Sequence, residues 1–355
     1  MSTTLHARPT SHPAQPELEV RTRAEKRSRD PWFDNAKMLL VTLVVVGHGW
    51  TLLPHHLVDA WLYDFLYLWH VPAFVMVTGY LSRSFTWSRR DMRRLMTSVA
   101  LPYVIFEAAL AAFRFGVGGE EMDMLFADPH WPMWYLAALL LWRLATPALK
   151  ALPGAMPLAV VVSLLGGLAT TEVLDVSRAT GLLPFFVLGL LARREHLDAL
   201  RDGRFRTAAW GVLGTAFLLC SLVDGRMRTE WMYWRSGFAE LGVTALEGMA
   251  VRFGLMVAAG LVALSFLTLV PRTGGWFSRL GAATLVVYLF HGFFVKGAEY
   301  AGLASWTAEN PVLGLLATTG GAVLLALTLA APPVARRLNT VVDPVGTRHA
   351  RLSRR

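Results

Sequence analysis

The chain has 355 residues, of which 54% are apolar and only 17% are charged. An average soluble domain is roughly a quarter charged, so this composition argues against a soluble fold. The single cysteine, Cys220, excludes a disulfide framework, a Cys-based zinc site and an iron–sulfur cluster, and we expect no metal. The net charge of +9 would suggest nucleic acid as a partner, but the basic residues lie between apolar runs. This arrangement is typical of a polytopic membrane protein and excludes a nucleic-acid groove.

Residues 1–30 are polar, contain three prolines and end in a basic stretch, without the apolar core of a signal peptide. We therefore expect a disordered, uncleaved cytoplasmic tail. Residues 31–340 form one predicted membrane domain without repeats, and residues 341–355 form a second basic cytoplasmic tail. Apolar windows predict an all-α bundle of about ten transmembrane helices. These lie near residues 37–53, 60–82, 95–116, 132–148, 155–172, 179–193, 207–223, 246–270, 281–302 and 311–335.

The distribution of Lys and Arg provides an independent test of this organisation, because short cytoplasmic loops are enriched in both. With an inside N-terminus and ten spans, 26 basic residues lie on the cytoplasmic side and 4 on the opposite side. Those four are Arg178, Arg226, Arg228 and Arg235. The pattern predicts a multi-pass protein of the cell membrane with both termini in the cytoplasm.

Ionisable side chains at bilayer depth are costly and therefore mark candidate functional sites. At a rise of about 1.5 Å per helical residue, His48 lies near the midplane, about 16 Å from Lys37. His70, Glu107 and His291 have a similar predicted depth on three other helices. The four groups could converge on one cavity. Glu107 could pair with a histidine or hold the acceptor, or it could form an ion pair within the bundle with Arg114 or Arg252. Each histidine could instead only bond a neighbouring helix.

Several segments follow one another in an order found in a known family. They are Asp34-Asn-Ala-Lys37 with LLVTLVVVGHGW after it, LWHVPAFVMVTGYL at 68–81, SRRDMRRL before ALPY, MWYLAALL at 133–140, LLPFFVLGL at 182–190 and VVYLFH ending at His291. Together they resemble the membrane acyltransferase 3 family, in particular its fucose 4-O-acetylase-like branch. The resemblance covers nearly all of residues 30–340.

The resemblance implies a catalytic group on the first helix. In that family a basic residue and a histidine are separated by ten residues, and the histidine is regarded as catalytic; here they are Lys37 and His48, with Asp34 nearby. The basic residue is more often Arg in the family, and Lys lacks the planar bidentate fork of Arg. A neutral imidazole, with an ordinary pKa of about 6.5, is also suited to accept a hydroxyl proton at neutral pH. We therefore assign His48 as the general base.

Other residues are candidates for holding the two substrates. Arg89, Arg90, Arg93 and Arg94 lie in the predicted cytoplasmic loop before the third helix and match a paired-basic motif of the family. Arg suits the phosphates of coenzyme A, although such residues also serve as ordinary topology anchors. His70, Glu107 and His291 are candidates for orienting a substrate. Trp134 and Tyr135 lie at the expected outer mouth of the fourth helix, where they could stack on a sugar or only anchor the helix in the interface.

These observations predict an integral membrane O-acyltransferase that moves an acetyl or short acyl group from cytosolic acyl-CoA to a hydroxyl. The acceptor implied by the resemblance is a carbohydrate of a surface glycan or its glycolipid precursor. The main alternative is a proton-coupled secondary transporter or exporter, because buried His, Glu and Arg also suit a proton relay. Transporters often contain repeated halves, and the sequence has no detectable repeat.

Overall fold

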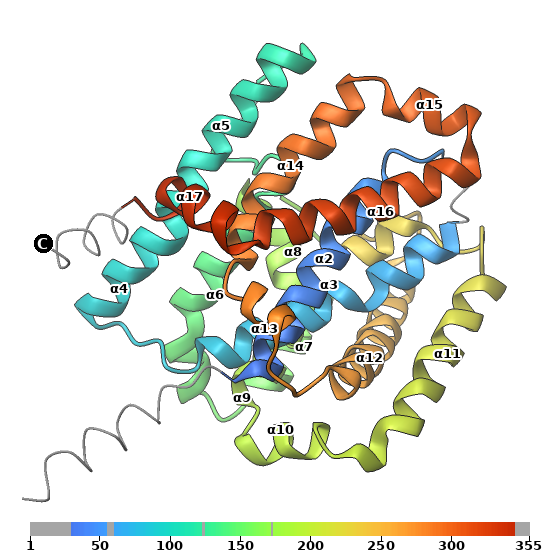
Figure 1. Cartoon of the computed structure of the whole chain (residues 1–355). Coiled ribbons are helices and arrows are strands. Elements are labelled where there is room, and N and C mark those ends of the chain that lie inside the picture. Colours follow the sequence, from blue (N-terminus) through green and yellow to red (C-terminus); the bar gives the residue numbers. More distant parts are fainter. Residues whose placement is uncertain (1–29, 55–59, 123–124, 172, 345–355) are drawn as a thin grey trace, which may run out of the picture.

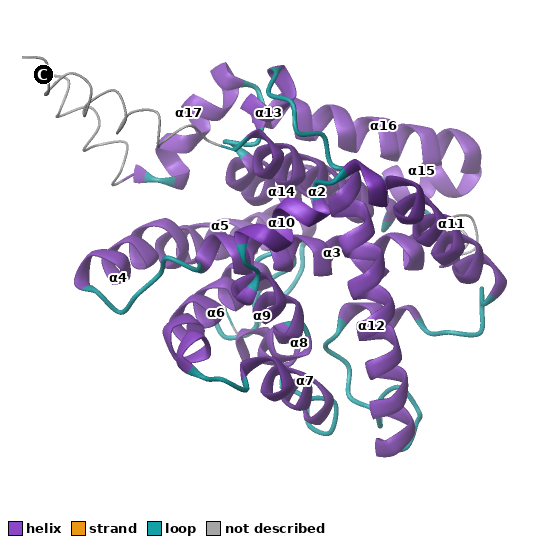
Figure 2. Cartoon of the chain, turned by 90° about the horizontal axis from the view of Figure 1, so that it is seen from below, coloured by secondary structure: helices purple, strands orange, loops and turns teal. Residues whose placement is uncertain are grey.

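The computed structural model describes residues 30–54, 60–122, 125–171 and 173–344. This part of the chain consists of helices joined by turns and loops and contains no β-strand (Figures 1 and 2). The fold class is therefore all-α, as expected. Most of the two predicted tails lies outside the described residues, so the domain boundaries at 30 and 340 stay predictions.

Two helices, α2 (Pro31–Trp50) and α3 (Ala60–Ser82), lie in the middle of the bundle (Figure 1). The side chain of Asp30 accepts a hydrogen bond of 3.0 Å from the backbone N–H of Trp32, and Pro31 occupies the first helical position. Both features favour a helix start, which explains why α2 begins several residues before its apolar run. The helices that pack around this pair are α9 (Leu183–Leu191), α12 (Ala245–Leu269), α14 (Thr284–Tyr300) and α16 (Pro311–Ala330).

Glycines allow α3 to touch α9 (Leu183–Leu191) closely. A Cβ atom on Gly79 would lie 2.1 Å from the carbonyl oxygen of Phe186. A Cβ atom on Gly189 would lie 1.9 Å from the carbonyl oxygen of Met76. The two backbones are therefore in direct contact, as is common where membrane helices pack through small residues.

The basic cluster lies on a helix and not in the loop that the sequence suggested. Helix α4 (Arg89–Leu95), the π-helical turn η1 (Met96–Ala100) and α5 (Leu101–Gly118) form one continuous helix of 30 residues. The Ser88 side chain caps its first turn by accepting from the N–H of Asp91. This local cap extends the helix well before the apolar run, through all four arginines.

The remaining helices follow in chain order. They are α6 (Trp134–Ala151), α7 (Ala155–Leu165), α8 (Val176–Gly181), α10 (Arg194–Leu200), α11 (Arg206–Leu222), α12 (Ala245–Leu269), α13 (Trp276–Leu280), α14 (Thr284–Tyr300), α15 (Leu303–Glu309), α16 (Pro311–Ala330) and α17 (Pro332–Val342). Each of the ten predicted segments contains an α-helix. Five helices in the described residues are long and apolar enough to cross a membrane, or up to six if the pair bent by 61° at α8 and α9 is one span. The number of ten spans and the side of the termini stay predictions.

Several outer helices expose large apolar side chains. Leu222 on α11, Leu246 on α12 and Val312 on α16 are 69%, 79% and 71% exposed. Large apolar side chains exposed to this extent are costly in water but match the hydrocarbon of a bilayer. The surface therefore supports the assignment to a membrane.

Candidate active site

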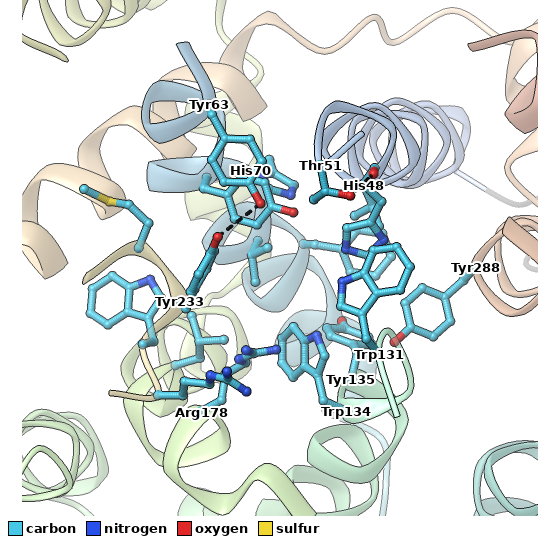
Figure 3. A pocket seen from close by; sticks show the side chains of 18 residues that line it. His48, Thr51, Tyr63, His70, Trp131, Trp134, Tyr135, Arg178, Tyr233 and Tyr288 are labelled. Atoms are coloured by element: carbon cyan, nitrogen blue, oxygen red, sulfur yellow. Dashed lines mark hydrogen bonds between the residues drawn. The ribbon is translucent and has the colours of Figure 1, made fainter. Parts of the chain in front are cut away.

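A cavity of about 300 Å³ lies at the Thr51 end of α2 (Figure 3). Its walls come from α2, α3, the loop before α6 and the start of α6, helix α8, the segment 232–235 and helix α14. The lining is mostly aromatic and contains polar groups on opposite sides. The lining residues are Val44, His48, Thr51, Tyr63, Tyr67, His70, Val71, Phe74, Trp131, Trp134, Tyr135, Arg178, Leu182, Met232, Tyr233, Trp234, Arg235 and Tyr288.

Two buried histidines from distant helices form a hydrogen-bonded pair at this cavity. Nδ1 of His48 lies 2.8 Å from Nε2 of His291, and Nδ1 of His291 lies 3.2 Å from the carbonyl oxygen of Val287. A carbonyl oxygen only accepts, so a neutral His291 donates from Nδ1 and accepts at Nε2. His48 must then donate from Nδ1. Its Nε2, which has no hydrogen bond to a described residue, keeps a lone pair on the cavity side.

The indole of Trp131 lies against this pair. Its ring centroid is 4.2 Å from that of His48, with the two planes tilted by 44°. An aromatic face at this distance attracts a cation and would therefore stabilise a protonated His48. Trp131 also lines the cavity, so it limits the positions that a substrate can take beside the imidazole.

Glu107 does not line the cavity but holds the chain next to Trp131. Its fully buried carboxylate accepts from the backbone N–H of His130 at 3.0 and 3.1 Å. The ring Nδ1 of His130 lies 2.5 Å from the same carboxylate. Of the alternatives for Glu107, the structure shows the pairing with a histidine. The partner is His130, which lies 23 residues away in a loop, and not Arg114 or Arg252.

Arg252 and Arg114, the two arginines expected as partners of Glu107, bind other groups. Arg252 donates to the carbonyl oxygens of Ser163 and Ser236, at 3.1 and 2.7 Å. Arg114 forms an ion pair with Glu120 just beyond the end of α5. Burial by itself raises the pKa of Glu120, but hydrogen bonds from Arg114, Tyr300 and Lys296 outweigh it and lower this pKa to about 2. This charged cluster ties α5 to α14 and lies outside the cavity.

His70 faces the same cavity from α3. Its Nδ1 lies 2.7 Å from the carbonyl oxygen of Leu66, one turn earlier in the helix. The carbonyl requires a donor, so a neutral His70 has its proton on Nδ1 and a lone pair on Nε2. The cavity therefore contains a second hydrogen-bond acceptor, suited to orient a hydroxyl group.

A second cavity of about 300 Å³ lies toward the Lys37 end of α2. Lys37 and Arg143 are its cationic lining residues, together with Thr78 and Ser98 and mainly apolar side chains. Three side chains, Phe74, Tyr135 and Tyr288, line both cavities. The two hollows are therefore separated by a thin aromatic wall close to the middle of the bundle.

Lys37 and Asp34 pair with each other and not with His48. The Lys37 ammonium lies 2.8 Å from the Asp34 carboxylate and donates to the carbonyl oxygen of Gly281 at 3.0 Å. Lys37 and His48 are 11 positions apart on α2, which separates them by about 16 Å along the helix axis. Lys37 can consequently meet only a group that enters the second cavity.

The structure places the other predicted site residues as follows. Trp134 and Tyr135 line the first cavity with His48 and His70, while His291 contacts it through His48. Arg89, Arg90, Arg93 and Arg94 are exposed on α4 and line neither cavity. One turn after Arg94, however, Ser98 reaches the second cavity and donates to the carbonyl oxygen of Arg94 at 2.7 Å. The basic cluster thus continues the helix that lines this cavity.

Sequence reasoning did not single out Trp131, Arg143, Arg178, Tyr233 or Tyr288. The sequence analysis treats Arg143 and Arg178 only as charges of the loops. A signal is present in the sequence for both, since Arg143 lies within the predicted helix 132–148 and Arg178 directly precedes the predicted helix 179–193. Trp131 and Tyr233 lie in connecting segments without any periodic signal. Among the described residues, no group of three His, Cys, Asp or Glu side chains could hold a metal ion.

Comparisons with known proteins identify a family for this chain. A family model described as an acyltransferase domain, of the acyltransferase 3 type, matches residues 30–331. The nodulation protein NolL of Mesorhizobium japonicum (strain LMG 29417 / CECT 9101 / MAFF 303099) is 41% identical over 63 residues. That similarity covers 17% of this chain and 17% of NolL, so it concerns a short segment only. No solved structure matches the chain.

Proposed function

We propose that this chain, which belongs to the acyltransferase 3 family, is an integral membrane O-acyltransferase with His48 as its general base. The observation that supports this most directly is the His48–His291 pair beside a cavity. A base held by a second group, with its free nitrogen facing the reactants, is the arrangement that acyl transfer to a hydroxyl requires. His291 acts as the orienting group, in the role that a carboxylate often has.

In the proposed reaction an acceptor hydroxyl binds beside Nε2 of His48. The hydroxyl proton moves to Nε2 while its oxygen attacks the carbonyl carbon of the acyl thioester. The tetrahedral intermediate then expels the thiolate, which takes the proton from the imidazolium to leave as a thiol. The imidazolium is stabilised by its Nδ1–H bond to His291 and by the face of Trp131.

The donor in this proposal is acyl-CoA, and it enters through the second cavity. This cavity combines two cations, Lys37 and Arg143, with an apolar lining suited to the thioester arm. The coenzyme phosphates would lie farther out, near the exposed arginines of α4. The acceptor, a carbohydrate, would occupy the first cavity, whose aromatic side chains can stack on a sugar ring. The thioester and the hydroxyl meet at Phe74, Tyr135 and Tyr288.

The test is transfer of labelled acetyl from acetyl-CoA by the purified full-length protein in nanodiscs, compared with His48→Ala. We expect a loss of about 10²- to 10⁴-fold in kcat, the range that general base catalysis supplies. The exposed His196 of α10 provides a matched control, and His196→Ala should keep its activity. Thermal unfolding of both variants should resemble that of the wild type.

Two outcomes would contradict the proposal. Retention of more than about a tenth of the wild-type rate in His48→Ala would remove the base from the mechanism. A wild-type protein that moves protons or solutes across liposomes but transfers no acetyl would favour the transporter alternative. In that case the histidine pair would serve a proton relay.

A further inference from the structure

We propose that the first cavity recognises an acceptor that carries a negative charge, through Arg178 and Arg235. This inference rests on the proposed function, because it assigns the acceptor to this cavity. It specifies the chemical class: a sugar bearing a carboxylate or a phosphate, as opposed to a neutral sugar. Figure 3 shows Arg178 beside Trp134, on the side of the cavity away from His48.

Arg178 is a mostly buried cation that retains unused donor capacity. Its guanidinium carbon lies 4.5 Å from the ring centroid of Trp134, and Nη1 lies 3.3 Å from the Asp175 carboxylate. Its Nε is buried and has no hydrogen-bond partner among the described residues. A guanidinium forms up to five hydrogen bonds, and leaving a charged donor buried without partners is unfavourable. An anionic ligand would supply those partners.

Arg235 adds a second positive charge from another element. It lines the cavity from the loop before α12, and its side chain has no hydrogen bond or ion pair to another described residue. Among the described lining residues there is no Asp or Glu, since the neighbouring carboxylate of Asp175 lies outside the lining. Two arginines therefore contribute to a lining that holds no carboxylate among the described residues.

The position of the two arginines suits a sugar ring that carries an anionic substituent. Trp131, Trp134 and Tyr135 line the cavity with aromatic rings on which a sugar ring can stack, while His48 needs one hydroxyl of that ring on the side opposite Arg178. A ring with an anionic substituent at one end would be held at that end by bidentate bonds from arginine. The hydroxyl at its other end would then point toward Nε2 of His48.

The experiment measures binding without turnover, by quenching of tryptophan fluorescence in phosphatidylcholine nanodiscs that contain no anionic lipid. The probes are methyl glucuronide and its neutral counterpart methyl glucoside, with glucose 1-phosphate as the phosphate-bearing probe. We expect at least one anionic probe to bind about tenfold more tightly than the glucoside, and added salt to reduce this preference. Whether the glucuronide or the phosphate binds more tightly identifies the source of the charge.

Arg178→Gln and Arg235→Gln should each remove most of the preference for the charged probe. The matched control is Arg226→Gln, which removes an exposed arginine of the same loop that does not line the cavity. If Arg178→Gln fails to fold, Arg235→Gln still tests the proposal, because Arg235 is exposed and its replacement should not disturb folding. Equal binding of charged and neutral probes, no binding of either anion, or an equal effect of Arg226→Gln would overturn the proposal.

The experiments distinguish a failure of the anionic-acceptor proposal from a failure of the proposed function. Loss of transfer in His48→Ala with a preference for neutral probes would contradict the anionic acceptor alone. A clear preference for anions in a protein that transfers no acetyl group would contradict the acyltransferase mechanism, and the arginine site would remain.

Discussion

A single backbone carbonyl group determines which ring nitrogen carries the proton in His291, and another does so in His70. The carbonyl of Val287 faces Nδ1 of His291, and the carbonyl of Leu66 faces Nδ1 of His70. Each carbonyl demands a donor, so both rings keep a lone pair on Nε2. For His291 that lone pair accepts from His48. The proposed base is thus oriented by a helix carbonyl through one intervening ring, without a carboxylate.

At the same scale, Glu107 is expected to act as a positioning residue. The change Glu107→Gln removes the charge opposite His130 but retains the side-chain shape, and Trp131 should then lose its fixed place against His48. Small displacements near reacting groups are costly, so we expect kcat to fall about tenfold or more. The KM for acyl-CoA should stay unchanged, because the donor enters the other cavity.

Steady-state kinetics with varied acetyl-CoA would measure this effect of Glu107→Gln. Glu121→Gln removes an exposed carboxylate outside both cavities and serves as the control. A fall in the amount of folded protein with an unchanged kcat would show that Glu107 has a structural role only.

Among the helices, the continuous one from α4 through α5 joins the basic cluster to the second cavity. Its four arginines are exposed before the π-helical turn, and Ser98 within that turn lines the cavity. A π-helical turn often occurs at a functional site. The helix could therefore guide a donor from its charged end toward the thioester position.

Replacing Arg89, Arg90 and Arg93 together by Gln tests this role. If they hold coenzyme phosphates, the donor KM should rise several-fold and depend less on salt, while kcat at saturating donor changes little. Kinetics at low and high salt would measure both quantities.

The control for this triple variant removes the same charge from another basic segment, at Arg193, Arg194 and Arg206. If the control raises the donor KM and the α4 variant does not, the phosphates bind at the control segment. If the α4 variant mainly reduces insertion, its arginines are topology anchors.

The two ends of the molecule differ in their charged residues, and each end contains a different cavity. The Lys37 end contains the second cavity and the exposed arginines of α4, while the Thr51 end contains the first cavity and the segment with Arg235. Positive charge near membrane helices favours the cytoplasm. A cytosolic donor and an acceptor on the other face are consistent with this polarity.

Labelling of intact cells with a membrane-impermeant maleimide would determine the orientation. In a Cys220→Ser background, Arg226→Cys should react from outside, whereas Thr273→Cys should react only after lysis. Both positions are exposed in loops. The reverse pattern would place the Lys37 end outside and would separate the second cavity from any cytosolic donor.

The amino-acid sequence by itself determined the all-α class, the membrane location and the position of His48 within an apolar helix. These features follow from composition and from periodicity within short segments, which are local properties. The family also followed from the sequence, because its motifs occur in order along the chain.

Tertiary structure alone decided which groups meet. His48 contacts His291 across 243 residues, and Glu107 binds His130 in a loop rather than an arginine in a neighbouring helix. Depth in the bilayer, the quantity accessible from sequence, is shared by many side chains on different helices and says nothing about which of them face each other. Helix rotation and packing set those contacts. The close approach of α3 and α9 shows this, because a Cβ atom at Gly79 or Gly189 would clash with the backbone of the facing helix. For the same reason the sequence predicts a surface charge at Arg178, whereas the structure shows that α8 places Arg178 in the wall of the cavity.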